Sequence, residues 1–433
     1  MRPFLLASGD MSTDTHGPRR VRPLRVPPPP PPNREVECLK EVNDVLALTL
    51  WKALRHVNTW ATVEPAERRR YFRPLTDESR EMWAYARFTA PELDPALATF
   101  ALMVQAPDAI DREQIGAACE IVYAWADARG MALTAVFFAE AAAYVLSDLA
   151  SRANQAARAA RRSLMRDRAA MWYMRAYRLA RVSENKKERR REQIWALLGY
   201  GAMMRDAGNY DEARRFIERA ARRAVGLRRR KEAGMAYHEL FVIAAEREQY
   251  TLAAKYARNA LTRYPIWHVS LPHFAHDVAF MLYIRQQQYA SALAILSKVL
   301  PLMQVSRDRA LVLSSLAWAA GGAGLRERYQ GSAAATLVQM GEHREYAPAI
   351  FIHLAQGARL LGEWERALGY AEAASESAVQ NEDEVLQREA AGLVEAIKRR
   401  EASGVEANPD DELDSFSRCL VARLERWRPR RPR

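Results

Sequence analysis

Residues 193–224 read QIWALLGYGAMMRDAGNYDEARRFIERAARRA, two amphipathic segments separated by the dipeptide Gly208-Asn209. Within each segment apolar residues recur three and four positions apart, which is the period of an α-helix. Gly and Asn favour helix ends because they adopt the left-handed backbone conformation at low cost. The stretch therefore predicts a helical hairpin that turns at Gly208. In the same way, a helix pair over 113–129 and 131–146 is expected to turn at Gly130.

Similar units recur along the chain with a period of about 40 residues, as self-comparison shows. Aromatic residues in turn-like contexts follow one another at spacings of 40, 39, 40 and 35: Tyr210, Tyr250, Tyr289, Tyr329 and Trp364. The two cleanest units, 237–265 and 351–374, carry large residues in the first helix and alanines in the second, so that neighbouring helices approach closely. The stretch 321–324, Gly-Gly-Ala-Gly, predicts a break in a weaker unit.

These units resemble the tetratricopeptide repeat family, whose first helix carries W-x2-L-G-x2-Y and whose second carries A-x3-F-x2-A. The match to the first motif is Trp195, Leu198 and Gly199, with Ala202 at the Tyr position, and the match to the second is Ala213, Ile217 and Ala220. The resemblance covers residues 190 to 376, with a period longer than the family's 34. It implies an all-α, right-handed superhelix of helical hairpins whose concave face holds a peptide or a folded partner.

The resemblance also implies a set of partner-binding residues on the first helices. The family's groove positions correspond here to Gln193, Ala196, Tyr200, His238, Val242, Asp277, Met281, Arg285, Gln356 and Arg359. The Lys and Asn pattern with which some family members clamp a C-terminal carboxylate is missing from this set, which disfavours chaperone-tail binding of that type.

The repeat array is expected to be one of five parts of the chain. The expected parts are a disordered Pro-rich tail (1–33), an N-terminal helical region (34–150), the array (151–380), capping helices (381–425) and an Arg-rich tail (426–433). Six consecutive prolines, Pro27 to Pro32, favour extended polyproline II and are interpreted as a spacer, the alternative being a ligand for an aromatic-lined domain. Met11 is an alternative start to Met1. The helix expected near 413–427 is predicted to dock on the last repeat.

Positive charge is concentrated in the middle of the chain. The formal net charge is +12, and residues 151–231 hold 24 basic and 8 acidic side chains. Such a region attracts an anionic partner, nucleic acid or an acidic protein, in a salt-dependent way, although solvated helix faces explain a charge run equally well. The candidate basic patch comprises Lys186, Lys187, Arg189, Arg190, Arg191, Arg228, Arg229 and Arg230. The aromatic residues Trp172, Tyr173 and Tyr177 either stack on bases or, as we prefer, fill the core.

Motifs for catalysis and metal binding are missing. The sequence has no Walker A, dinucleotide-binding, H-E-x-x-H or G-x-S-x-G motif, so no enzyme activity and no cofactor are predicted. His268, His273, His276 and Asp277 fall close together, but their spacing matches no metal motif. The three cysteines form no CxxC pair, and no run of 18 apolar residues occurs, which together favour a cytoplasmic protein without stable membrane insertion.

The sequence therefore predicts a non-enzymatic protein-interaction platform that binds a protein or peptide partner. Two alternatives stay open. One is a tetratricopeptide-type sensor or regulator that contacts nucleic acid through residues 151–231, and the other is an accessory subunit of a multi-protein complex. The oligomeric state is left open.

Overall fold

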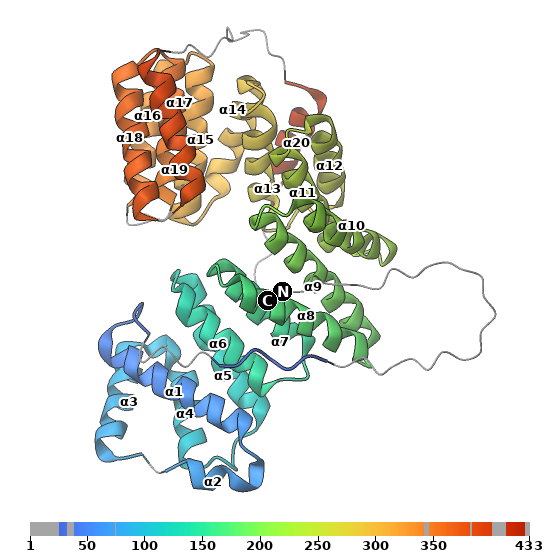
Figure 1. The fold of residues 1–433 in the computed structure, drawn as a ribbon, viewed down its shortest axis with the longest axis vertical. Coiled ribbons are helices and arrows are strands. Elements are labelled where there is room, and N and C mark those ends of the chain that lie inside the picture. The colour runs from blue at the N-terminus through green and yellow to red at the C-terminus, as the bar shows by residue number, and fades with distance from the viewer. Residues whose placement is uncertain are drawn as a thin grey trace, which may run out of the picture. The chain divides into compact units, whose positions relative to one another are not determined.

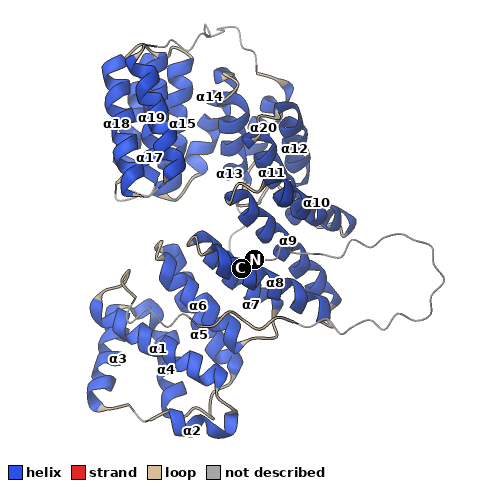
Figure 2. Cartoon of the chain, in the orientation of Figure 1, coloured by secondary structure: helices blue, strands red, loops and turns tan. Residues whose placement is uncertain are grey.

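The computed structural model describes residues 26–32, 39–73, 75–341, 346–381, 383–400 and 413–428. The regular elements among these residues are helices, with no β-strand, and successive helices pack in adjacent pairs (Figures 1 and 2). The predicted all-α array of helical hairpins is confirmed. Most of the predicted tail 1–33, with both candidate start residues, and the last five residues of the predicted Arg-rich tail lie outside the described residues.

By its internal contacts the chain divides into two compact units, Met1–Glu192 and Gln193–Arg433. The division falls inside the range 151–380 that the sequence analysis assigns to the array. The long helix α9 (Lys186–Asp206) begins in the first unit and ends in the second. The two units are described separately.

The first unit opens with the long helix α1, followed by short, proline-interrupted helices, and continues with two hairpins. Its elements are α1 (Asp44–Thr62), η1 (Pro65–Glu67), α2 (Arg68–Tyr71), α3 (Asp77–Thr89), η2 (Pro91–Leu93), α4 (Asp94–Gln105), α5 (Arg112–Ala128), α6 (Ala132–Val145), α7 (Ala150–Arg162) and α8 (Arg166–Val182). Helix α6 is the centre of this unit, since it packs against α1, α5 and α7 and is buried along most of its length. Its alanines allow these neighbours to approach closely.

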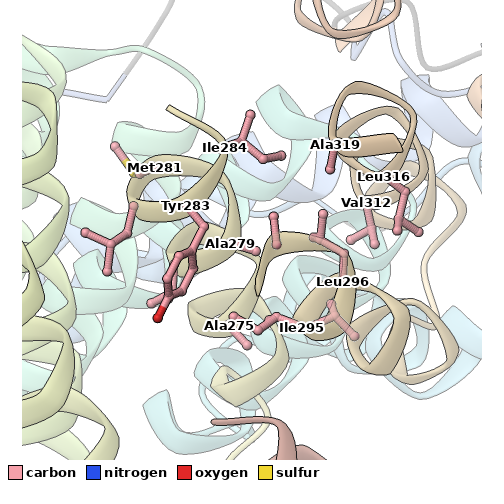
Figure 3. Close-up of a cluster of buried hydrophobic side chains, with 14 of the residues drawn as sticks. Ala275, Ala279, Met281, Tyr283, Ile284, Ile295, Leu296, Val312, Leu316 and Ala319 are labelled. Atoms are coloured by element: carbon pink, nitrogen blue, oxygen red, sulfur yellow. The ribbon is translucent and has the colours of Figure 1, made fainter. Parts of the chain in front are cut away.

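The second unit contains the clearest repeats. Its elements are the rest of α9, α10 (Tyr210–Gly226), α11 (Arg230–Glu246), α12 (Tyr250–Arg263), α13 (Leu271–Asp277), η3 (Val278–Ile284), α14 (Tyr289–Val299), η4 (Leu300–Leu302), α15 (Ser306–Gly322), α16 (Arg326–Met340), α17 (Ala347–Leu360), α18 (Trp364–Gln380), α19 (Glu384–Lys398) and α20 (Ser415–Glu425). Figure 3 shows the apolar core around η3, α14 and α15, with Tyr283, Leu296 and Leu316 among its members.

Every hairpin from α5 to α18 turns on one residue in the left-handed region of backbone space. These residues are Gly130, Leu164, Gly208, Glu248, Gln287, Gly324 and Gly362. At the turn predicted from the sequence, the N–H of Asn209 donates to the carbonyl of Met204 over 2.8 Å, which satisfies a free carbonyl at the end of α9. The predicted hairpin turns at Gly130 and Gly208 are confirmed.

The expected break at 321–324 is the turn between α15 and α16. Helix α15 ends at Gly322, and the chain turns at Gly324. The aromatic residue Tyr329 does not mark this turn, because it lies inside α16, which begins at Arg326. Gly321 and Gly322, in the last turn of α15, allow close packing between helices.

The C-terminal helix α20 docks on the middle of the second unit and not on the last repeat. It packs against α13 and α14, and Tyr283 donates a hydrogen bond of 2.9 Å to Asp414 at its N-terminus. At its other end Trp427 donates to the carbonyl of His268 over 3.1 Å. The last pair, α17 and α18, is covered by α19 instead. The α20 residues Phe416, Leu420 and Leu424 are buried in the core of this unit.

Candidate functional site

A cleft of about 320 Å³ lies in the second unit, lined by residues of η3, α15, α17 and α19 and of nearby turns. The side chains that give it chemical character are Phe280, Arg285, Trp318, Gln356, Arg359 and Glu389. It therefore combines aromatic surface with two guanidinium groups, one amide and one carboxyl.

A widened helical turn places two of these side chains. In η3 the N–H of Arg285 donates to the carbonyl of Phe280, five residues earlier, over 3.2 Å. Such π-helical turns insert one residue relative to an α-helix and are frequent at functional sites. Both Phe280 and Arg285 line the cleft as a result, and the Arg285 guanidinium lies 5.5 Å from the centre of the Phe280 ring.

The aromatic wall of the cleft is held by a buried histidine. Phe280 and Trp318 meet edge to face with ring centres 5.6 Å apart, and both rings pack on His353. Burial, together with smaller contributions from the neighbouring His276 and Arg285, lowers the pKa of His353 to about 3. His353 is therefore neutral at physiological pH, and its Nδ1 is hydrogen-bonded to the Ser314 hydroxyl over 2.9 Å.

Both guanidinium groups of the cleft are available to a ligand. Among the described residues neither Arg285 nor Arg359 forms an ion pair or a side-chain hydrogen bond, and the Nε of Arg359 is buried without a partner. Glu389 lies at the same cleft, where burial raises its pKa and the charge of Arg285 opposes that rise. A buried donor without a partner carries a free-energy cost that a carboxylate ligand would remove.

Of the residues predicted to bind a partner, the cleft brings together Arg285, Gln356 and Arg359. Met281 is 6% exposed and belongs to the apolar core, as does Ala196 in the packing of α9. The one-residue insertion in η3 explains the placement of Met281, because it turns that side chain inward and Phe280 toward the cleft. Phe280 was missed because no local pattern signals a π-helical turn, and Trp318 and Glu389 were missed because they do not occupy the groove positions that the repeat pattern assigns.

Three further predicted residues, Gln193, Tyr200 and Val242, contact neighbouring side chains of the second unit instead of lining the cleft. Gln193 is buried and accepts a hydrogen bond from Arg223, while Tyr200 packs edge to face on Phe216. Val242 is half-buried beside the core.

Three polar pairs link successive first helices, and in each the partners are 39 residues apart: His238 with Asp277, His276 with Ser315, and Ser314 with His353. The distance between His238 Nε2 and Asp277 Oδ2 is 2.8 Å. Burial favours a raised pKa for Asp277, but hydrogen bonds with His238 and His276 hold it well below its usual range. Residues 39 positions apart occupy the same place in successive repeats. The three pairs, called the ladder below, therefore fix how the repeats stack.

The predicted basic patch is split between the two units. Lys186, Lys187, Arg189, Arg190 and Arg191 lie in the first, and Arg228, Arg229 and Arg230 in the second. Arg191 pairs with the buried Glu192 over 2.9 Å, and Arg230 donates to the carbonyl of Thr262 over 3.2 Å. The aromatic residues of the Arg-rich region, Trp172, Tyr173 and Tyr177, are at most 5% exposed. The core interpretation of these rings is confirmed, and none presents a face to a base.

Within the described part of the chain no group of three His, Cys, Asp or Glu side chains is arranged to hold a metal ion. The histidines near residue 270 are used separately. The Nδ1 of His268 accepts from the N–H of Ser270 over 3.1 Å, whereas His276 belongs to the ladder. No helix among the described residues is long and apolar enough to cross a bilayer.

No protein-family model and no curated protein matches the chain. Among solved structures it is similar to the Rap conjugation gene regulator of the plasmid pLS20 in complex with the Phr* peptide, with 16% identity, a TM-score of 0.38, and coverage of 82% of this chain and 98% of that one. It is also similar to the P58(IPK) TPR domain, with 12% identity, a TM-score of 0.24, and coverage of 81% and 98%. These superpositions are loose, so the fold described above rests on the helix pairs of this chain itself.

Proposed function

We propose that the protein is a non-enzymatic interaction platform that holds a peptide segment of a partner protein in the cleft of its second unit. The observation that carries this proposal is the pairing of an aromatic wall with two guanidinium groups, those of Arg285 and Arg359, that form no ion pair among the described residues. Clefts of this kind bind through a few desolvated anchors.

The chemistry of the cleft specifies the segment. A guanidinium group forms paired, charge-assisted hydrogen bonds with a carboxylate, and these bonds are stronger than those between neutral groups. The rings of Phe280 and Trp318 offer apolar surface for a neighbouring side chain. We therefore expect the bound segment to carry Asp or Glu beside an aromatic or aliphatic residue.

Two alternatives were left open by the sequence. The regulator that contacts nucleic acid has weaker support, and the accessory subunit is a form of the same proposal. The rings that would stack on bases in the Arg-rich region are buried, so a nucleic-acid contact there lacks a stacking surface. An accessory subunit of a larger complex would be one form of the same platform. Cys119 and Cys419 are both free thiols, which agrees with a reducing, cytoplasmic compartment.

The test is a selection of random dodecapeptides displayed on phage against the immobilised full chain. Enriched peptides should contain an acidic residue next to an apolar one, and the double variant Arg285→Glu, Arg359→Glu should not enrich them. Enrichment of peptides without acidic residues, or equal recovery on the double variant, would overturn the proposal.

A further inference from the structure

The six-proline segment is docked on the first unit. Residues 26–32 run past α6 and α8, and appear in Figure 1 as the dark-blue stretch that passes the labels of α6 and α7. Pro30 is buried. The six prolines favour a spacer in sequence, but in the structure they lie against side chains of their own unit.

Three side chains of this surface hold the segment by its backbone. The Tyr144 hydroxyl donates to the carbonyl of Pro30 over 2.9 Å, and Arg168 Nη1 donates to that of Pro31 over 3.0 Å. Arg175 Nη1 donates to the carbonyl of Pro27. All three contacts reach carbonyl oxygens, which are the only backbone hydrogen-bonding groups that a run of prolines offers.

A buried network fixes two of the donors. Glu140, only 1% exposed, accepts hydrogen bonds from Arg168 Nε over 2.7 Å and from Trp172 Nε1 over 2.8 Å. The ring of Tyr144 packs against that of Trp172 with centres 5.5 Å apart. A buried carboxylate is costly unless it is paired, and here its pairing aims a guanidinium group at the segment.

Arg175 is fixed separately. Its Nη2 donates to the carbonyl of Ser147 over 2.7 Å, and the residue is 8% exposed. This surface therefore presents donors in fixed positions beside an aromatic ring. This arrangement suits polyproline II, which has no internal hydrogen bonds, exposes its carbonyls and loses little conformational entropy on binding.

We propose that this surface, formed by side chains of α6 and α8, is a recognition site for polyproline II segments and that residues 26–32 are its resident ligand. Recognition through carbonyl oxygens reads the backbone conformation, so a separate peptide of the same conformation fits the site when the resident segment is removed. The site lies in the first unit and does not depend on the function proposed for the cleft in the second.

The test uses the full chain with residues 27–32 replaced by alternating Gly and Ser, so that no polyproline segment of the chain itself occupies the surface. The probe is a fluorescent, end-blocked peptide with the sequence of residues 26–32, followed by anisotropy. We expect saturable binding to the replaced chain, and at least tenfold weaker binding to the unaltered chain because its tethered segment competes at high effective concentration.

A second variant isolates one contact. Tyr144→Phe in the replaced chain removes a single hydroxyl and should weaken peptide binding about three- to tenfold, whereas Tyr123→Phe, on α5, should leave it unchanged. A control peptide with Gly at alternate positions should not bind. Lack of saturable binding to the replaced chain, or equal affinity for the Tyr144→Phe variant, would overturn the proposal.

Discussion

A side-chain carbon added to Gly321 would lie 2.2 Å from the carbonyl oxygen of Gly357, so α15 and α17 touch through their backbones at this point. A carbon added to Gly357 would in turn lie 2.9 Å from the carbonyl oxygen of Ala317. Glycine weakens a helix interior, and these two residues are tolerated because no other residue permits this approach of successive first helices.

Gly321→Ala should therefore destabilise the protein by about 2–3 kcal/mol, since the added carbon meets backbone and not a side chain that can move. The matched control is Gly331→Ala on α16, where the added carbon meets open space. This variant should be more stable than the unaltered protein by about 0.5–1 kcal/mol, because alanine favours a helix interior over glycine. Urea unfolding of both variants provides the measurement. A neutral Gly321→Ala variant would contradict the backbone contact.

Leu164→Gly should stabilise the first unit. Leu164 has φ of 57° at the turn between α7 and α8, and its side chain is 76% exposed. A left-handed backbone costs a leucine about 1–2 kcal/mol, and glycine removes this strain. Because glycine is also more flexible in the unfolded chain, the net increase in the free energy of unfolding should be about 0.5–1 kcal/mol. Leu164→Ala, which keeps the strain, is the control in the same urea measurement. A gain with alanine equal to that with glycine would argue against relief of strain.

Stability should fall below pH 6.5 because of His353. Its pKa is about 3 in the folded chain against an ordinary 6.5, so it takes up a proton on unfolding in this range. The contribution of His353 to the free energy of unfolding is complete above about pH 6.5. It is lost by about 1.4 kcal/mol per pH unit as the pH falls toward the pKa of His353 in the folded chain.

Between pH 7.5 and 5.0 this loss amounts to about 2 kcal/mol, and His353→Asn should show a correspondingly smaller decrease. Urea unfolding at the two pH values checks the prediction. The same decrease in both proteins would show that His353 does not carry the effect.

Leu420→Ala should destabilise the second unit by about 2–4 kcal/mol, because this side chain of α20 is fully buried in the core formed with α13 and α14. Arg418→Ala, at an exposed position of the same helix, should change stability little. If Leu420→Ala were as stable as the control in calorimetric unfolding, the docking of α20 on the middle of the unit would be wrong.

Local features of the fold were predictable from sequence, and features that depend on distant residues were not. The turns at Gly130 and Gly208 were predicted because a left-handed helix end has a local signal. The reversed roles of Phe280 and Met281 were not, since the π-helical turn in η3 has none.

The proline segment follows the same rule. Its extended conformation could be read from six prolines, but its binding surface could not, because Arg168 and Arg175 lie more than 130 residues away and look in sequence like ordinary charges on a helix. In the cleft, Arg285 and Arg359 were found through the repeat pattern, whereas Trp318 and Glu389 required the packing of four elements.

The central claim, that Arg285 and Arg359 bind an acidic peptide in the cleft, is tested most directly by calorimetric titration of the best peptide from the display selection into the full chain. The account predicts that the double variant Arg285→Glu, Arg359→Glu binds it at least about tenfold more weakly than the unaltered chain. Lys255→Glu, a charge reversal at an exposed position of α12 outside the cleft, should bind it with unchanged affinity. Equal affinities of the double variant and the unaltered chain would contradict the account.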